Sequence, residues 1–489
     1  MKTLKISLQI LSLIALFCCK PTLEKGSALN PEQLESAYEL YRQSDIQQRR
    51  FKYDSVIHLI KERDALFQIE EIGKSVEQKP IFQLSIGNGS TKVMLWSQMH
   101  GNESTATMAL FDLMNFLEGQ EDDYVDIREK ILSKLQIRII PMVNPDGMDM
   151  WIRRNKLEID LNRDAVALVS PEAKILKNAR DTFEPDFGFN LHDQQIYYNV
   201  SKTSKPATIS VLAPAYNYET EVNEVRKRAM QVIIGMNQML QQTIPGQVGK
   251  YDDAFEPRAF GDNFQKWGTS TILIESGGYP QDPEKQNIRK LNFMMMLHAL
   301  IQIAEQTYPQ YKLEDYYAIP DNDLKLMDVM IKNLSLENSG YTYQADLGIR
   351  RREADTQEGY YVNGSIEDMG DLSVFYGYET LDASELEIRE GKIYETPFDQ
   401  ISNITKEKAD QLLKSGYLAV IVKEAKGNEI YNLPILILSQ KDKIPFKIRT
   451  GGSPNFYLAK GEELKYALVN GYLIDLQNKI DQEYRMIVQ

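Results

Sequence analysis

The sequence predicts an α/β fold, a mostly parallel mixed sheet flanked by helices, followed by a smaller mostly-β C-terminal domain. Strand-like apolar runs alternate with helical stretches between about residues 51 and 306, as in a parallel sheet covered by helices. After about residue 321 the chain becomes rich in Tyr and is punctuated by Gly, with short alternating runs. At 489 residues the chain is also too long for one ordinary domain.

Residues 1–19 have the pattern of an export signal. Two lysines precede an apolar run from about Ile6 to Phe17, which is too short to span a bilayer. Cys19, with Leu16 three residues before it, is typical of a bacterial lipoprotein signal, and Cys18 is the other candidate for lipidation. A plain signal peptide is the alternative. We therefore expect an exported protein of the cell envelope, on the periplasmic or outer-membrane side, that contacts the membrane only through an N-terminal lipid anchor.

The composition limits the disulfides that the protein can form and the classes of partner that it can bind. The two cysteines of the signal are the only ones, so the mature protein can form no internal disulfide. The formal charge of −14 argues against nucleic acid or an anionic membrane surface as the main partner. No later segment is long and apolar enough to predict a transmembrane helix.

Residues 20–50 are polar and helix-prone, and we expect the α/β domain over 51–315 and the accessory domain over 321–489. The strands of the α/β domain are expected, in chain order, at 81–87, 92–98, 135–143, 187–193, 208–215 and 270–276. Its clearest helices are expected at 223–242 and 287–306, and one helix, at 405–416, should interrupt the accessory domain.

The turn "SQMHGNEST", Ser97 to Thr105, joins a strand-like run to a helix-like run and places His100 three residues before Glu103. His192 ends the strand-like run "FGFNLHD". Because the carboxyl ends of parallel strands meet at one edge of a sheet, these three residues are expected to lie together. The remaining histidines, His58 and His298, lie in helical patterns and are interpreted as ordinary helix residues.

Two histidines and one glutamate form a known ligand set for catalytic zinc, which leaves a coordination position open for water. The accessory region after residue 321 has no His or Cys and so offers none of the usual nitrogen or sulfur ligands. The sequence therefore predicts one Zn²⁺ per chain in the α/β domain.

Further motifs follow in order. The run "MVNPDG" ends at Gly147, "WIRRNKLEIDLNRD" spans Trp151 to Asp164, and "STILIES" carries a late strand-end glutamate. With the H-x-x-E turn and the strand-end histidine, this ordered set resembles the zinc carboxypeptidase family, the carboxypeptidase A-like metallopeptidases. The resemblance covers roughly residues 51–305.

The resemblance implies roles for individual residues. His100, Glu103 and His192 match the zinc ligands, and Asp160 matches a carboxylate that orients a ligand histidine. The remaining matches are Asn162 and Arg163 for a free C-terminal carboxylate, Arg153 for the developing oxyanion and Glu275 for the general base.

The expected function is therefore that of a zinc-dependent metallocarboxypeptidase, which hydrolyses the C-terminal bond of a peptide with a free C-terminus through zinc-activated water. One segment departs from the family pattern. Tyr251 is the only tyrosine in "GKYDDAFEPRAFGDNFQKWG", where many members have a mobile tyrosine. The charges of this segment also leave open which terminal residue is preferred.

Other functions stay open. Deacylases of N-acyl amino acids share an HGNE turn and an N-R pair, but the N-P-D-G turn and the adjacent Arg153 and Arg154 favour a peptidase. Hydrolysis of murein peptides, by carboxypeptidase or endopeptidase action, also fits an envelope location. The alternative of another class is a non-catalytic binding lipoprotein. Such a protein would be expected to lack a ligand or the base, and here every such position is filled.

Overall fold

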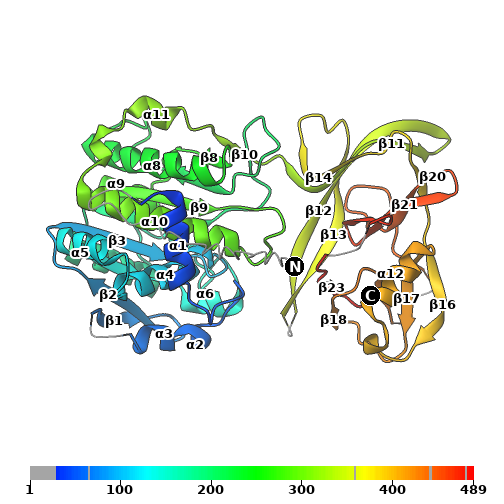
Figure 1. The fold of residues 1–489 in the computed structure, drawn as a ribbon, viewed down its shortest axis with the longest axis horizontal. Helices are drawn as coiled ribbons and strands as arrows, with labels where there is room; N and C mark the ends of the chain where they lie inside the picture. Colours follow the sequence, from blue (N-terminus) through cyan, green and yellow to red (C-terminus); the bar gives the residue numbers. More distant parts are fainter. Residues whose placement is uncertain (1–28, 64–65, 357–358, 440–442, 479–481) are drawn as a thin grey trace, which may run out of the picture.

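The computed structural model describes residues 29–63, 66–356, 359–439, 443–478 and 482–489 (Figure 1). The predicted export signal, with Cys18 and Cys19, lies outside these residues. Among the helices that the structure describes, none has both the length and the apolar character needed to cross a membrane.

An eight-stranded sheet forms the centre of the N-terminal part, with strand order β1-β2-β4-β3-β5-β9-β7-β8 (Figure 1). The neighbours β4, β3, β5 and β9 run parallel, whereas β1, β2 and β7 make antiparallel pairs towards the two sides. The mostly parallel mixed sheet predicted from the sequence is confirmed. Its strands are β1 (Gln68–Lys74), β2 (Pro80–Ile86), β3 (Thr91–Ser97), β4 (Leu135–Ile140), β5 (Phe187–Asp193), β7 (Ile209–Leu212), β8 (Val248–Lys250) and β9 (Ser270–Ser276).

Both faces of the sheet are covered. Along β3, Val93 and Leu95 join the larger apolar core, and Met94 and Trp96 join a smaller one on the other face, as the two-residue period of a strand requires. Residues of α1 (Pro31–Tyr41), α2 (Tyr53–Val56), α3 (His58–Lys61), α4 (Thr105–Glu118), α5 (Val125–Lys134), α8 (Glu224–Thr243) and α10 (Gln286–Glu305) belong to the larger core. Residues of α7 (Pro171–Phe183) and α9 (Phe260–Lys266) belong to the smaller core.

Two strands are shorter than predicted. β4 ends at Ile140, because the next residue, Pro141, has no N–H for the ladder. β7 ends at Leu212, and the N–H of Ala213 donates instead to the Tyr316 hydroxyl of α11 (Leu313–Tyr317) at 3.0 Å.

The C-terminal part is mostly β, as predicted, and forms a separate lobe in Figure 1. One sheet contains β11 (Leu326–Asn338), β12 (Tyr341–Thr356), β13 (Gly359–Gly370) and β14 (Tyr376–Asp382); a second contains β15 (Glu387–Arg389), β20 (Phe456–Lys460), β21 (Glu463–Val469) and β22 (Tyr472–Asp475). A third contains β16 (Lys392–Phe398), β17 (Tyr417–Val422) and β19 (Leu436–Leu438), beside the predicted helix α12 (Lys406–Lys414); β18 (Ile430–Tyr431) pairs with β23 (Met486–Ile487). The domain boundary proposed between residues 315 and 321 stays a prediction.

One set of contacts between the two lobes lies at the loop that follows β5. The Tyr197 hydroxyl lies 2.9 Å from Asp328 Oδ2 and 2.7 Å from the carbonyl oxygen of Arg351. The Tyr378 hydroxyl donates to the Ile196 carbonyl oxygen. β10 (Asn322–Asp323) also pairs with β6 (Asn199–Val200). The accessory lobe is thus fastened to the segment directly after the strand that carries His192.

Candidate active site

The turn with His100 and Glu103 is built against the N-P-D-G turn. At Gly101 an added Cβ would lie 1.9 Å from the carbonyl carbon of Gly147, so only glycine allows this approach. Asn144 caps α6 (Pro145–Met150), since its Oδ1 accepts from the Gly147 N–H at 2.9 Å. Its Nδ2 donates to the Met99 carbonyl oxygen at 3.2 Å. The two motifs therefore form one rigid unit at the end of β3.

Strand register brings the other residues to the same edge. β5 runs parallel to both β3 and β9, and its register pairs His192 with Glu275. Because paired residues on neighbouring strands point to the same face, the histidine and the glutamate lie side by side.

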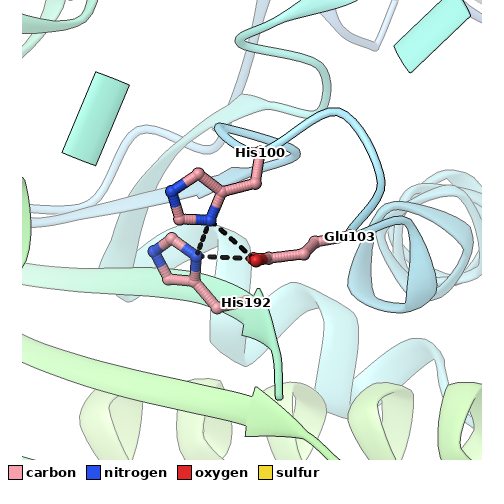
Figure 2. Close-up of side chains that lie close together, drawn as sticks. All are labelled: His100, Glu103 and His192. Atoms are coloured by element: carbon pink, nitrogen blue, oxygen red, sulfur yellow. Dashed lines mark hydrogen bonds and ion pairs between the residues drawn. The ribbon is translucent and has the colours of Figure 1, made fainter. Parts of the chain in front are cut away.

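Figure 2 shows His100, Glu103 and His192 converging on one point. The Glu103 carboxylate lies 2.8 Å from Nδ1 of each histidine, through Oε1 for His100 and Oε2 for His192. The two Nδ1 atoms are 3.2 Å apart. All three side chains are buried, and their ligand atoms lie within 4.8 Å of one another. Neither His58 nor His298 belongs to this group.

These atoms suit a cation. The Nε2 of His100 lies 3.1 Å from Asp160 Oδ1 and, as the protonated nitrogen, donates to it, which leaves the Nδ1 lone pair facing Glu103. Burial opposes ionisation of Glu103, but the two imidazoles outweigh it and hold the pKa of Glu103 well below its usual range. Lone pairs and an ionised carboxylate at these distances need a proton or a metal ion between them. The donor set is that of a catalytic zinc site, and the residues fit one Zn²⁺.

Arg153 lies over this cluster. Its Nε donates to Asp160 Oδ2 at 3.0 Å, and its Nη1 donates to Glu103 Oε1 at 3.2 Å. Burial raises the pKa of Asp160, but His100 and Arg153 outweigh this effect and lower the pKa. The Arg153 side chain is 43% exposed, so its guanidinium can also meet a group that enters from solvent.

Glu275 has a different environment from Glu103. Within the described chain its carboxylate makes no side-chain ion pair. Burial, followed by the negative charges of Glu103 and Asp193, raises the pKa of Glu275 well above the usual value. A carboxyl group with a raised pKa beside a metal-type cluster is suited to accept and return a proton.

Asn162 and Arg163 lie in a short 3₁₀ turn, Leu161–Arg163, which Asp160 caps by accepting the Asn162 N–H at 3.0 Å. The Asn162 Oδ1 accepts from the N–H of Phe260 at 2.9 Å. The Arg163 Nη1 donates to the Asn162 carbonyl oxygen at 2.7 Å. Asp160 thus links this pair to His100, so the candidate carboxylate site adjoins the metal cluster.

The sequence interpretation missed Asp193 and Lys285. The Lys285 ammonium donates to Asp193 Oδ2 and to the Ser276 carbonyl oxygen, both at 3.0 Å. Asp193 and Ser276 directly follow His192 and Glu275 in chain order and are themselves register partners. Lys285 therefore joins the ends of the two strands. A buried lysine is rare and so suggests an ionic partner. The local sequence does not show that this partner is Asp193, because Asp193 lies 92 positions earlier in the chain.

Tyr251 lies beside the site. Its ring is 5.9 Å from that of Tyr198, and burial together with the charge of Glu275 raises its pKa.

A buried His₂Glu cluster at the carboxyl edge of a mixed α/β sheet, with an adjacent arginine and glutamate, defines the class of zinc-dependent hydrolases. Residues 53–168 match the family model described as zinc carboxypeptidase. Over these residues the chain is similar to the zinc carboxypeptidase family.

Curated relatives are similar over short regions. The chain is 28% identical over 122 residues to "Probable carboxypeptidase 2" of Arthroderma benhamiae, which covers 23% of this chain and 22% of that protein. It is 29% identical over 112 residues to "Gamma-D-glutamyl-L-diamino acid endopeptidase 1" of Lysinibacillus sphaericus, which covers 22% of this chain and 28% of that protein. The chain thus spans less than a third of the length of these two relatives.

Among solved structures, a metallo-carboxypeptidase from Burkholderia cenocepacia aligns with a TM-score of 0.43 and 17% identity, over 53% of this chain and 70% of that one. A metallo-carboxypeptidase from Pseudomonas aeruginosa aligns with a TM-score of 0.40 and 15% identity, over 52% of this chain and 70% of that one.

Proposed function

We propose that this chain is a zinc-dependent metallocarboxypeptidase that removes the last residue of peptides with a free C-terminus. The observation that carries the proposal is the convergence of two Nδ1 atoms and the Glu103 carboxylate, with the two Nδ1 atoms 3.2 Å apart. Zinc held by these residues would supply Lewis acidity and lower the pKa of water towards about 7.

In this proposal Glu275 holds the proton. Its raised pKa lets the carboxyl group keep a proton taken from the attacking water until the amine leaves, and then return it. Arg153, directed at the cluster and 43% exposed, donates to the oxygen on which negative charge develops. Loss of one such donor typically costs about 3–4 kcal/mol in the transition state.

Asn162 and Arg163 give the proposal its exopeptidase character. A guanidinium donates to a carboxylate in a fork, and an amide adds another donor. The Arg163 side chain is 37% exposed and can therefore meet the end of a substrate. A carboxylate held there would place the last peptide bond next to the metal cluster.

The test compares one peptide as the free acid and as the C-terminal amide. We expect the free acid to lose its last residue and the amide to be cut more slowly by orders of magnitude, because a neutral amide cannot form the charged, forked contact with Arg163. Arg163→Ala should lose most activity on the free acid and discriminate much less between the two. Arg154→Ala is the matched control, since Arg154 donates to the Glu158 carbonyl oxygen in the neighbouring loop. Equal hydrolysis of acid and amide by the parent would refute the exopeptidase proposal.

Murein peptides form the second candidate substrate class. The similarity to the Lysinibacillus sphaericus endopeptidase supports this candidate, together with the export signal expected from the sequence. Incubation with a murein digest, followed by mass spectrometry, decides between the two. Release of stem-peptide fragments without attack on linear peptides would favour the murein substrate.

We also propose that the chain is exported and anchored through a lipid on Cys19. The lysines, the apolar run and the cysteine that follows it support this location. The mass of the mature N-terminus tests it, because a diacylated Cys19 and a plain signal cleavage give different masses.

A further inference from the structure

Arg163, which is proposed to hold the substrate carboxylate, already contacts a carboxylate of its own chain. Its Nε lies 3.2 Å from Oε2 of Glu256. Glu256 belongs to the segment between β8 and α9, in the stretch that also contains Tyr251. The Glu256 carboxylate that contacts Arg163 is therefore chemically equivalent to the terminal carboxylate of a peptide.

Glu256 also has a second cationic partner. Arg258 donates from Nε to Oε1 and from Nη2 to Oε2, both at 3.0 Å, in the forked geometry that arginine favours. The backbone N–H of Glu256 donates to Asp262 Oδ1 at 3.0 Å. The backbone is thus fixed near Arg163, and the carboxylate is shared between two guanidinium groups.

This arrangement allows exchange. The Glu256 side chain is 29% exposed, Arg163 is 37% exposed and Arg258 is 61% exposed, so each pair is weak and reversible. If an incoming carboxylate takes Arg163, Glu256 keeps its forked contact with Arg258 and is not left without a partner. Displacement from Arg163 therefore costs less than the loss of a sole partner.

We propose that Glu256 is an internal competitor that occupies the carboxylate site of Arg163 until a substrate carboxylate displaces it onto Arg258. This inference rests on the proposed function, because it takes Arg163 as the group that binds the substrate terminus. It makes Glu256 a residue that sets the affinity for free C-termini. It also gives Arg258 a role, namely to hold Glu256 in its displaced position.

The proposal predicts opposite effects for the two partners. Glu256→Gln keeps the shape and removes the competing charge, so KM for a free-acid peptide should fall about two- to fivefold, the range expected for a partly exposed ion pair, with kcat unchanged. Arg258→Gln removes the alternative partner and binds Glu256 more firmly to Arg163, so KM should rise by a similar factor. If the cluster had a purely structural role, KM would change in the same direction in both variants.

The experiment measures kcat and KM of the zinc-loaded full chain on one free-acid peptide for the parent, both variants and Arg163→Ala. Glu385→Gln is the matched control, because it removes one negative charge from an ion pair with Lys460 in the accessory lobe. A lower KM for Glu256→Gln together with a higher KM for Arg258→Gln supports the proposal. An unchanged or raised KM for Glu256→Gln overturns it, and a rise would mean that Glu256 orients Arg163 for the substrate.

This outcome is separate from that of the proposed function. If the parent releases no C-terminal residue, or if Arg163→Ala behaves as the parent, the carboxypeptidase proposal fails. If the parent cleaves and Arg163 is required, but the Glu256 and Arg258 variants do not shift KM in opposite directions, only the competitor proposal fails.

Discussion

Replacement of Glu275 by glutamine should have two opposite consequences. It removes the proposed proton acceptor, so kcat should fall about 10²- to 10⁴-fold. It also replaces a carboxyl group whose pKa is raised by burial and by the charges of Glu103 and Asp193 with a neutral amide of the same shape. The metal-free variant should therefore be more stable than the metal-free parent at neutral pH.

The direction in which stability changes with pH follows from the linkage between proton binding and folding. Because the folded-state pKa of Glu275 is raised, its contribution to stability is fully present below the ordinary Glu pKa and is lost as pH rises through the raised value. Between an ordinary pKa of about 4.3 and pH 7 the loss can reach at most about 3.7 kcal/mol. Since the side chain is partly exposed, we expect a gain of about 1–3 kcal/mol for Glu275→Gln at pH 7, and none near pH 4.

Urea unfolding of EDTA-treated protein, followed by tryptophan fluorescence, measures this gain. All three tryptophans of the chain, Trp96, Trp151 and Trp267, precede residue 315, so the signal comes from the α/β lobe. The same variants are then loaded with zinc and assayed for turnover. Glu62→Gln, at an exposed site on the end of α3, is the control for the loss of one charge.

A metal-free Glu275→Gln protein that is less stable than the parent at pH 7, or a gain that is equal at pH 4 and pH 7, would refute the electrostatic reasoning. Near-normal kcat in the zinc-loaded variant would show that another group accepts the proton.

Three further substitutions test the site. His192→Ala should lose bound zinc, measured by mass spectrometry of the metal, while circular dichroism stays that of the parent; full zinc occupancy would contradict the ligand assignment. Asp160→Asn removes the carboxylate acceptor of His100 Nε2 and should weaken zinc binding about 10- to 100-fold in a competition titration with a chelator. Lys285→Met leaves Asp193 buried without its cation and should destabilise the α/β lobe by about 3–5 kcal/mol, with partial rescue by Lys285→Arg. Equal stability of the two Lys285 variants would contradict a charge-based role.

Much of the α/β lobe follows from local sequence signals. Apolar runs such as that of β5 are strands because a central strand is buried on both faces. The residue directly after each of β3 and β5 is polar, Gln98 and Gln194 respectively. The shared edge of His100, Glu103 and His192 then follows from parallel pairing, which places the carboxyl ends of neighbouring strands together.

What sequence could not predict are pairs set by long-range packing. Lys285 meets Asp193, and Glu256 meets Arg163, only because loops far apart in the chain fold onto one edge of the sheet. The position of the accessory lobe could not be predicted from the sequence for the same reason. Its β content follows from alternation and Tyr-rich composition, but its attachment through Tyr197 depends on tertiary packing that no local pattern encodes.

The central proposal is that one zinc ion at the His100–Glu103–His192 cluster gives this chain its carboxypeptidase activity. The most direct test adds zinc stepwise to the metal-free protein and measures, at each step, the amino acid released from the C-terminus of a free-acid peptide. The release rate should rise linearly with added zinc and level off at one zinc per chain. Release without zinc, a plateau at another stoichiometry, or full zinc binding with no release of a terminal residue would contradict it.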